Sequence, residues 1–259
     1  MEINNKVWML SWLLASARLL GVFLITPYLG QAVLPGLVRN GIIVVLSLIA
    51  VPLVMTQVSD IEYNLLSILG LVFKELFLGL MMGFFFSIPY WAVVSSGYFL
   101  DLQRGVFSAE LFSPTAGGNT SPLGEFLSRL MIVLLFSTGG FLLMYEVILM
   151  SFQSWPVDRF FPVLTPEAAH IVLKQFDLLM YTMALLAGPI IAIMLVIEIG
   201  AAIIGRDIPE LNVFLLVMPI KSGMTLFILI FYILFLARYF KQNALVYSEK
   251  FQLLDAILR

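Results

Sequence analysis

Residues 100–140 read LDLQRGVFSAELFSPTAGGNTSPLGEFLSRLMIVLLFSTGG and place one polar, glycine-rich break inside an otherwise apolar chain. The break begins with the charged cluster Asp101-Leu102-Gln103-Arg104-Gly105, directly after an apolar run. It ends at Glu125 and Arg129, which lie one helical turn apart as the next apolar run starts. Charge at the ends of membrane-grade helices is costly and usually belongs to a pore, a packed interior or an interface. We therefore expect this break to take part in the protein's function.

The composition places the chain among membrane proteins. Of its 259 residues, 61% are hydrophobic and 12% charged, whereas soluble domains carry about 25% charged residues. A net charge of −2 provides no basic field for nucleic acid. The chain has no cysteine and one histidine, which excludes disulfides, thiol catalysis and Cys-based or His-rich metal sites. We expect no nucleic-acid partner, no cofactor and no bound metal.

Six apolar segments approach the length of about 20 residues that a helix needs to span a bilayer. They cover residues 7–25, 37–55, 63–100, 126–150, 171–204 and 213–239, and a charged, amphipathic tail follows over 241–259. Two segments are over-long and contain Pro89 and Pro189, where the loss of a backbone hydrogen bond favours a break or kink. The pattern predicts an all-α, membrane-associated protein built from helical hairpins.

Charged residues also lie at mid-depth in several apolar segments: Arg18, Lys74, Glu75, Glu146 and Glu198. Each of them either extends to the membrane surface or pairs inside a helical bundle, and together they indicate helices that face protein or water. Gly79 and Gly83 form a G-x-x-x-G pattern, which is typical of a face that packs closely on a neighbouring helix.

A second polar island, GRDIPELNVFLLVMPIK, covers residues 205–221. Lys221 lies two residues beyond Pro219 in an apolar run, so it requires an anionic or carbonyl partner. A helical hairpin whose tip and following break are both polar is typical of packing against similar hairpins. We expect a subunit interface here, at Pro209, Asn212, Pro219 and Lys221.

A series of short motifs runs in order along nearly the whole chain. They are Pro35 with Arg39-Asn40-Gly41, Ile88-Pro89-Tyr90-Trp91-Ala92, Asp101-Leu102-Gln103-Arg104-Gly105, Thr138-Gly139-Gly140, the run from Ser151 to Val157, Phe160-Phe161-Pro162, and the run from Leu211 to Ser222. In order and spacing the chain resembles the T components of the bacterial type III secretion export apparatus (the SpaR/YscT group), which are related to the flagellar export-gate protein FliR. Two details resemble the virulence-type secretion machine, the injectisome, more than the flagellum: the motif Gln103-Arg104-Gly105 and the pair Gly139-Gly140.

The resemblance implies a role without enzymatic activity. One T subunit joins R and S subunits in an export gate of the inner membrane, lifted partly out of the membrane plane, with the U and V export proteins as further partners. Unfolded substrate proteins pass through this gate, and lipid surrounds part of it. The resemblance also implies an R-like part over 1–200 with an S-like hairpin over 201–240.

In the resembled family, the loop after the Gln-Arg-Gly motif contributes to a plug that closes the resting pore. On this chain that loop is about 106–120. Its glycines permit unusual backbone angles, and its large apolar side chains suit sealing by dewetting. The expected plug residues are Val106, Phe107, Leu111, Phe112, Gly117 and Gly118, and the expected anchors are Asp101, Gln103, Arg104 and Gly105. A plain connector outside the membrane remains the alternative.

Other function classes fit less well. Broken helices and mid-depth charges also suit a secondary transporter for small solutes or ions, but the two halves show no internal repeat. An intramembrane enzyme would need a nucleophile and base, and the chain contains neither G-x-S-x-G nor H-E-x-x-H. A flagellar export-gate component is the nearer alternative.

Overall fold

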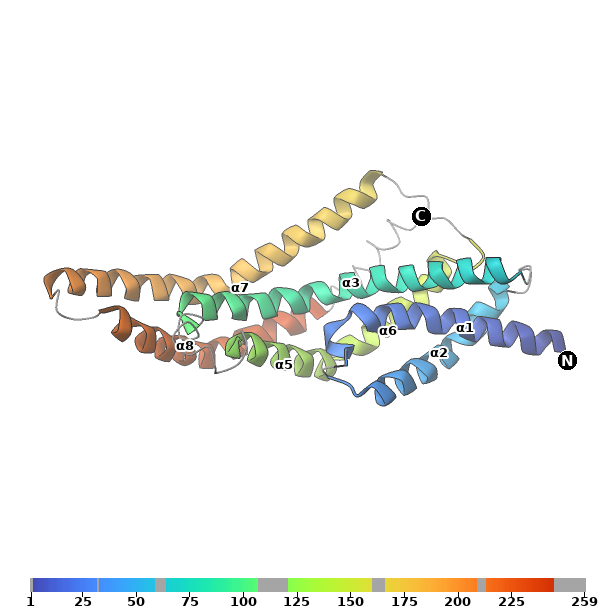
Figure 1. Ribbon diagram of the computed structural model, residues 1–259, viewed down its shortest axis with the longest axis horizontal. Coiled ribbons are helices and arrows are strands. Elements are labelled where there is room, and N and C mark those ends of the chain that lie inside the picture. Colours follow the sequence, from blue (N-terminus) through green and yellow to red (C-terminus); the bar gives the residue numbers. More distant parts are fainter. Residues whose placement is uncertain are drawn as a thin grey trace. The chain divides into compact units, whose positions relative to one another are not determined.

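A computed structural model describes residues 2–31, 33–58, 64–106, 121–159, 166–208 and 213–244. Every regular element in these ranges is helical, so the all-α prediction is confirmed. In chain order the elements are α1 (Glu2–Ile25), the short 3₁₀ helix η1 (Pro27–Leu29), α2 (Gly36–Val58), α3 (Leu65–Gln103), α5 (Pro122–Ser137), α6 (Gly140–Ser154), α7 (Pro166–Asp207) and α8 (Val213–Ala244), as drawn in Figure 1.

Five of the described helices are long and apolar enough to cross a membrane, or six if the pair α5 and α6 forms one bent span. Within the predicted apolar segment 126–150 the helix is interrupted between α5 and α6, so this segment is either one bent span or two shorter helices. Gly139 adopts φ +78° at this bend, a left-handed conformation that glycine reaches without steric cost. In contrast, Pro89 and Pro189 lie inside the helices α3 and α7 and do not divide them.

The chain folds as two compact units. The first contains the described residues up to Ile88 and those from Gly139 to Phe176, and the second contains Pro89–Thr138 and Asp177–Ala244. The long helices α3 and α7 therefore contribute residues to both. The division into an R-like part over 1–200 and an S-like hairpin over 201–240 concerns family likeness and stays a prediction.

In the first unit, glycines allow α1 and α3 to cross closely. A Cβ built on Gly79 would lie 2.0 Å from the main-chain oxygen of Arg18, and one on Gly21 would lie 2.4 Å from that of Leu76. A Cβ on Gly83 would meet the side chain of Ile25 at 2.3 Å. The G-x-x-x-G face thus packs against α1 of the same chain.

Arg18 is fully buried at this crossing and joins three parts of the first unit. Its Nε donates to Glu75 Oε2 at 2.5 Å and its Nη1 to Ser151 Oγ at 2.8 Å, while Nη2 reaches the carbonyl of Trp155 at 3.2 Å. The guanidinium lies 3.8 Å from the ring centroid of Phe152. A buried charge requires such complete pairing, so Arg18 fixes α1, α3 and α6 together.

Lys74 binds the turn that follows α6. Its ammonium lies 2.9 Å from Glu75 Oε1 and donates to the carbonyls of Pro156, Val157 and Arg159 at 2.8–3.2 Å. Two of the mid-depth acids differ in exposure: Glu75 is buried within this network, whereas Glu146 is exposed.

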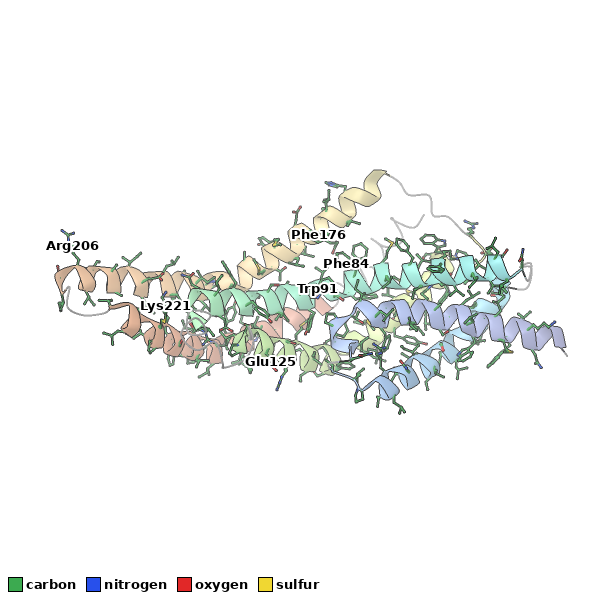
Figure 2. All side chains as sticks on the ribbon, in the orientation of Figure 1. Phe84, Trp91, Glu125, Phe176, Arg206 and Lys221 are labelled. Carbon is green, nitrogen blue, oxygen red and sulfur yellow. The ribbon has the colours of Figure 1, made fainter. Side chains whose placement is uncertain are left out.

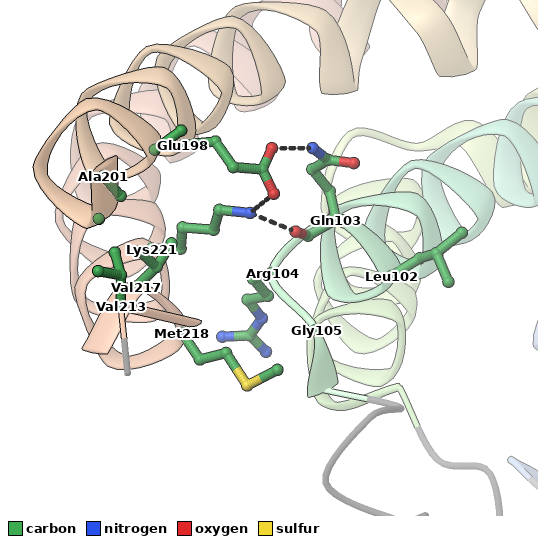
Figure 3. Close-up of a pocket in the computed structure, with 12 residues that line it drawn as sticks. Leu102, Gln103, Arg104, Gly105, Glu198, Ala201, Val213, Val217, Met218 and Lys221 are labelled. Atoms are coloured by element: carbon green, nitrogen blue, oxygen red, sulfur yellow. Dashed lines mark hydrogen bonds and ion pairs between the residues drawn. The ribbon is translucent and has the colours of Figure 1, made fainter. Parts of the chain in front are cut away.

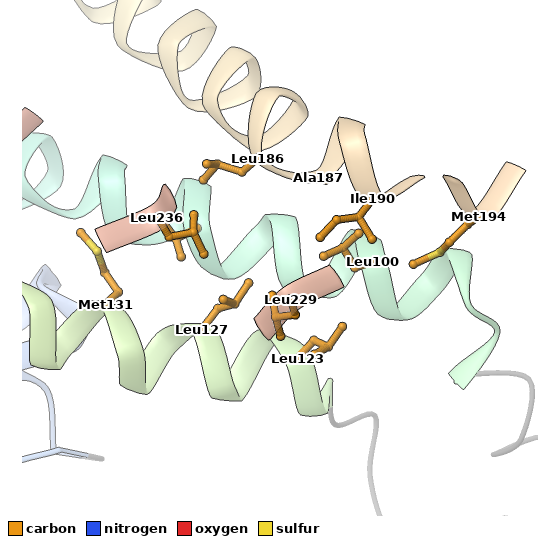
Figure 4. Packing of buried hydrophobic residues seen from close by; sticks show 11 residues of the cluster. Leu100, Leu123, Leu127, Met131, Leu186, Ala187, Ile190, Met194, Leu229 and Leu236 are labelled. Carbon is orange, nitrogen blue, oxygen red and sulfur yellow. The ribbon is translucent and has the colours of Figure 1, made fainter. Parts of the chain in front are cut away.

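The core of the second unit is apolar and lies among the end of α3, α5, α7 and α8 (Figure 4). Its buried side chains include Leu100 of α3, Leu123 and Leu127 of α5, Ile190 and Met194 of α7, and Leu229 and Leu236 of α8. This core positions the C-terminal end of α3 and the N-terminal end of α5, between which the glycine-rich break lies.

We expect Gly79→Ala to destabilise the protein, because the added methyl group meets backbone atoms that cannot rotate away. Overpacking of this kind costs about 1–3 kcal/mol. The matched control is Gly41→Ala in α2, where a Cβ meets nothing within 4 Å. The thermal unfolding midpoint in detergent should fall for Gly79→Ala alone; equal midpoints for the two variants would contradict the close crossing.

Candidate functional site

The helix α3 ends where the glycine-rich break begins. Its last helical residue is Gln103, and Gly105 follows with φ +82°. The amide of Gly105 donates to the carbonyl of Leu102 at 3.1 Å. A glycine in this left-handed conformation commonly terminates a helix, so the local sequence itself stops α3 here.

Asp101 holds both ends of the break together. Its Oδ1 accepts from Arg104 Nε at 2.7 Å, and its Oδ2 accepts from Ser121 Oγ at 2.6 Å and from the amide of Leu123 at 2.8 Å. Ser121 is also the N-cap of α5 and accepts from the amide of Gly124 at 2.9 Å. We call Asp101, Arg104 and Ser121 the Asp101 clamp.

Close packing of α3 on α5 makes the clamp possible. A Cβ built on Gly97 would lie 2.6 Å from the Cα of Gly124. Neither helix can carry a larger side chain at this point without moving apart. The glycine pair therefore brings the carboxylate of Asp101 within reach of the first turn of α5.

The clamp satisfies charges that water does not reach. Asp101 is fully buried and the Arg104 side chain is only 8% exposed. The first amides of a helix have no partners within it, and the partial positive charge there favours a carboxylate. Asp101 therefore stabilises the start of α5 as well as balancing Arg104.

A second polar cluster surrounds Gln103 (Figure 3). Glu198 of α7 accepts from the Gln103 side-chain amide at 3.3 Å and forms an ion pair with Lys221 of α8. Lys221 also donates to the main-chain carbonyl of Gln103 at 3.2 Å. We call Gln103, Glu198 and Lys221 the Gln103 ring. Lys221 is expected to need an anionic or carbonyl partner, and it has one of each, the carboxylate of Glu198 and the carbonyl of Gln103.

A cavity of about 450 Å³ adjoins this ring. Its polar lining comes from the ring and Arg104, and its apolar lining includes Val213, Val217 and Met218 of α8. Within the described ranges, no three acidic or histidine side chains lie close enough to share a metal ion. The site thus consists of ion pairs, hydrogen bonds and apolar packing.

The structure brings together the four expected anchors, Asp101, Gln103, Arg104 and Gly105, with Val106 directly after them. Pro219 lies inside α8, between the cavity-lining residues Met218 and Lys221. The other expected plug and hairpin residues lie outside the described residues: Phe107, Leu111, Phe112, Gly117, Gly118, Pro209 and Asn212.

Sequence reasoning missed Ser121 and Glu198 as site residues. The pair Ser121-Pro122 carries a recognisable signal, because serine before a proline is a common helix start. Glu198 was visible only as a charge in an apolar run, and nothing in the sequence pairs it with Lys221.

Residues 9–245 match the family described as bacterial export proteins, family 1. The chain is 36% identical over 251 residues to the Yop proteins translocation protein T of Yersinia pestis, covering 96% of both chains. It is 28% identical over 232 residues to the surface presentation of antigens protein SpaR of Salmonella typhimurium, covering 89% of this chain and 85% of that protein. It is 27% identical over 224 residues to the flagellar biosynthetic protein FliR of Bacillus subtilis, covering 85% of each chain.

We expect Asp101→Asn to destabilise the second unit, because it keeps the shape of the side chain but leaves Arg104 buried without its counter-charge. Breaking a buried pair in this way costs about 3–5 kcal/mol. Glu125→Gln is the control, since it removes an ion pair whose partners are 58% and 76% exposed, worth about 0.5 kcal/mol or less. Figure 2 labels Glu125 on the outer side of α5.

Unfolding midpoints in detergent measure both changes. A loss for Asp101→Asn no larger than that for Glu125→Gln would show that the clamp does not hold the break.

Proposed function

Because this chain belongs to the family of bacterial export proteins, family 1, we propose that it is a core subunit of the inner-membrane export gate of a bacterial type III secretion system. In this role it forms and closes part of the channel through which unfolded substrate proteins are secreted. Five or six of the described helices are long enough to span a membrane, which fits this location.

The observation that carries this proposal is similarity along the whole chain. The translocation protein T matches over 96% of its own length and 96% of this one, so the likeness covers the helices, the break and the C-terminal hairpin together. A small-solute transporter has no comparable support.

The injectisome is the better-supported setting. Identity to the translocation protein is 36% over 251 residues, against 27% over 224 residues for the flagellar relative. A flagellar export gate is the second candidate, favoured by the same family membership. In either setting the subunit acts by forming a passage, with no catalytic chemistry of its own.

We assign the segment 106–120 to closure of the resting channel. The Asp101 clamp supports this assignment, because it holds both ends of the segment with buried contacts. A segment fixed at its two ends returns to one place after each passage of substrate. Its apolar residues Phe107, Leu111 and Phe112 would then seal the channel against water and ions.

Exposed apolar surface supports the expected subunit partners. Only 17% of the apolar window of α7 and 22% of that of α8 are buried, against 56% for α1. Such surface requires lipid or neighbouring helices. We propose that the hairpin around Pro209, Asn212 and Pro219 packs against R and S subunits, with U and V proteins as further partners of the assembled gate.

Replacing residues 108–119 with a short Gly-Ser linker tests the closure role. The clamp keeps the two ends close, so the shortened segment still joins α3 to α5. We expect the subunit to co-purify with its R and S partners as before, and the cell membrane to become permeable to small ions or dyes whenever the complex is present.

An unrelated membrane protein expressed at the same level controls for general membrane damage. Normal secretion together with a sealed membrane would refute the closure role of this segment.

A further inference from the structure

The Gln103 ring joins three helices of the second unit through a closed set of contacts. Glu198 of α7 accepts from the side chain of Gln103, the last residue of α3, and pairs with Lys221 of α8. Lys221 completes the ring by donating to the carbonyl of Gln103. Figure 3 shows these three contacts meeting beside Arg104 and Gly105.

Lys221 acts as a cap on the C-terminus of α3. The last four carbonyls of a helix have no partners within it, and a cation near that end is favourable. Lys221 is 5% exposed and reaches this carbonyl from an apolar helix. It needs a counter-charge to remain there, and Glu198 supplies it.

The ring and the Asp101 clamp differ in how readily they can separate. Asp101 is completely buried, whereas Glu198 is 48% exposed. Water already reaches the carboxylate of Glu198, so this carboxylate loses less when its contacts separate than Asp101, which water does not reach, would lose. The cavity of about 450 Å³ beside the ring also leaves room for Gln103 and Lys221 to move.

We propose that Glu198 is a positioning residue of the export gate: through Lys221 it holds the C-terminal end of α3 in its resting position, and the ring is the contact that releases first. The clamp stays closed during this release. Only the purpose of this movement rests on the proposed function. The contacts of the ring themselves join residues that the structure describes.

Because the chain has no cysteine of its own, one introduced cysteine would be the only labelling site and can report on the ring. Val106 is half-buried and follows Gly105 directly. With Val106→Cys in the full chain, assembled with its export partners in detergent, the rate of labelling by a charged maleimide measures how often the end of α3 is released.

Glu198→Gln combined with Lys221→Met removes both charges together. Removing both partners leaves no unpaired charge in the buried position of Lys221, so this double variant avoids the unfolding that loss of Glu198 alone could cause. Losing charge-assisted hydrogen bonds should raise the labelling rate roughly tenfold. Lys221→Arg retains a donor to both partners and should label within about twofold of the parent.

The unfolding midpoint is measured in parallel, with Glu125→Gln as the surface control. A labelling rate of the double variant within about twofold of the parent, at equal unfolding midpoint, overturns the positioning role. Faster labelling with unchanged secretion and an intact membrane seal supports the ring and counts against the proposed closure function, so the two failures are distinct.

Discussion

The second unit depends on the carboxylate of one buried acid. Asp101 is satisfied only when Arg104, the hydroxyl of Ser121 and the first turn of α5 all lie around it. If any of these moves away, a charge is left in an apolar interior, which is costly. The end of α3 and the start of α5 cannot separate without that cost. This constraint turns a glycine-rich break into a segment with a fixed base.

In each unit a buried ion pair lies where glycines allow two helices to cross closely. In the first unit, Gly21 and Gly79 bring α1 onto α3 beside Arg18 and its partner Glu75. In the second, Gly97 and Gly124 bring α3 onto α5 beside the Asp101 clamp. Small residues allow backbones to approach, and the approach lets short polar side chains reach their partners. Apolar packing alone, as in the core of the second unit, would not specify these contacts.

The sequence predicted features that depend on local pattern and missed those that depend on distant contacts. The all-α fold follows from the length of the apolar runs, and the resemblance identified the family. The run over 126–150 stays apolar across the point where α5 ends and α6 begins. Hydropathy therefore could not detect this interruption, which coincides with the left-handed backbone of Gly139. The pairing of Asp101 with Ser121, and of Glu198 with Lys221, joins residues 20 and 23 positions apart, and no local pattern encodes either pair.

The central proposal is that the segment 106–120, whose base Asp101 holds, closes the resting channel. A photo-crosslinking amino acid at Phe112 tests this most directly, in cells where a substrate fused to a stable folded domain is stalled during secretion. The account predicts a crosslink between Phe112 and the stalled substrate, and none from the same probe at Glu125 on the exposed side of α5. Stalled substrate with no crosslink at Phe112, or equal crosslinking at both positions, would contradict it.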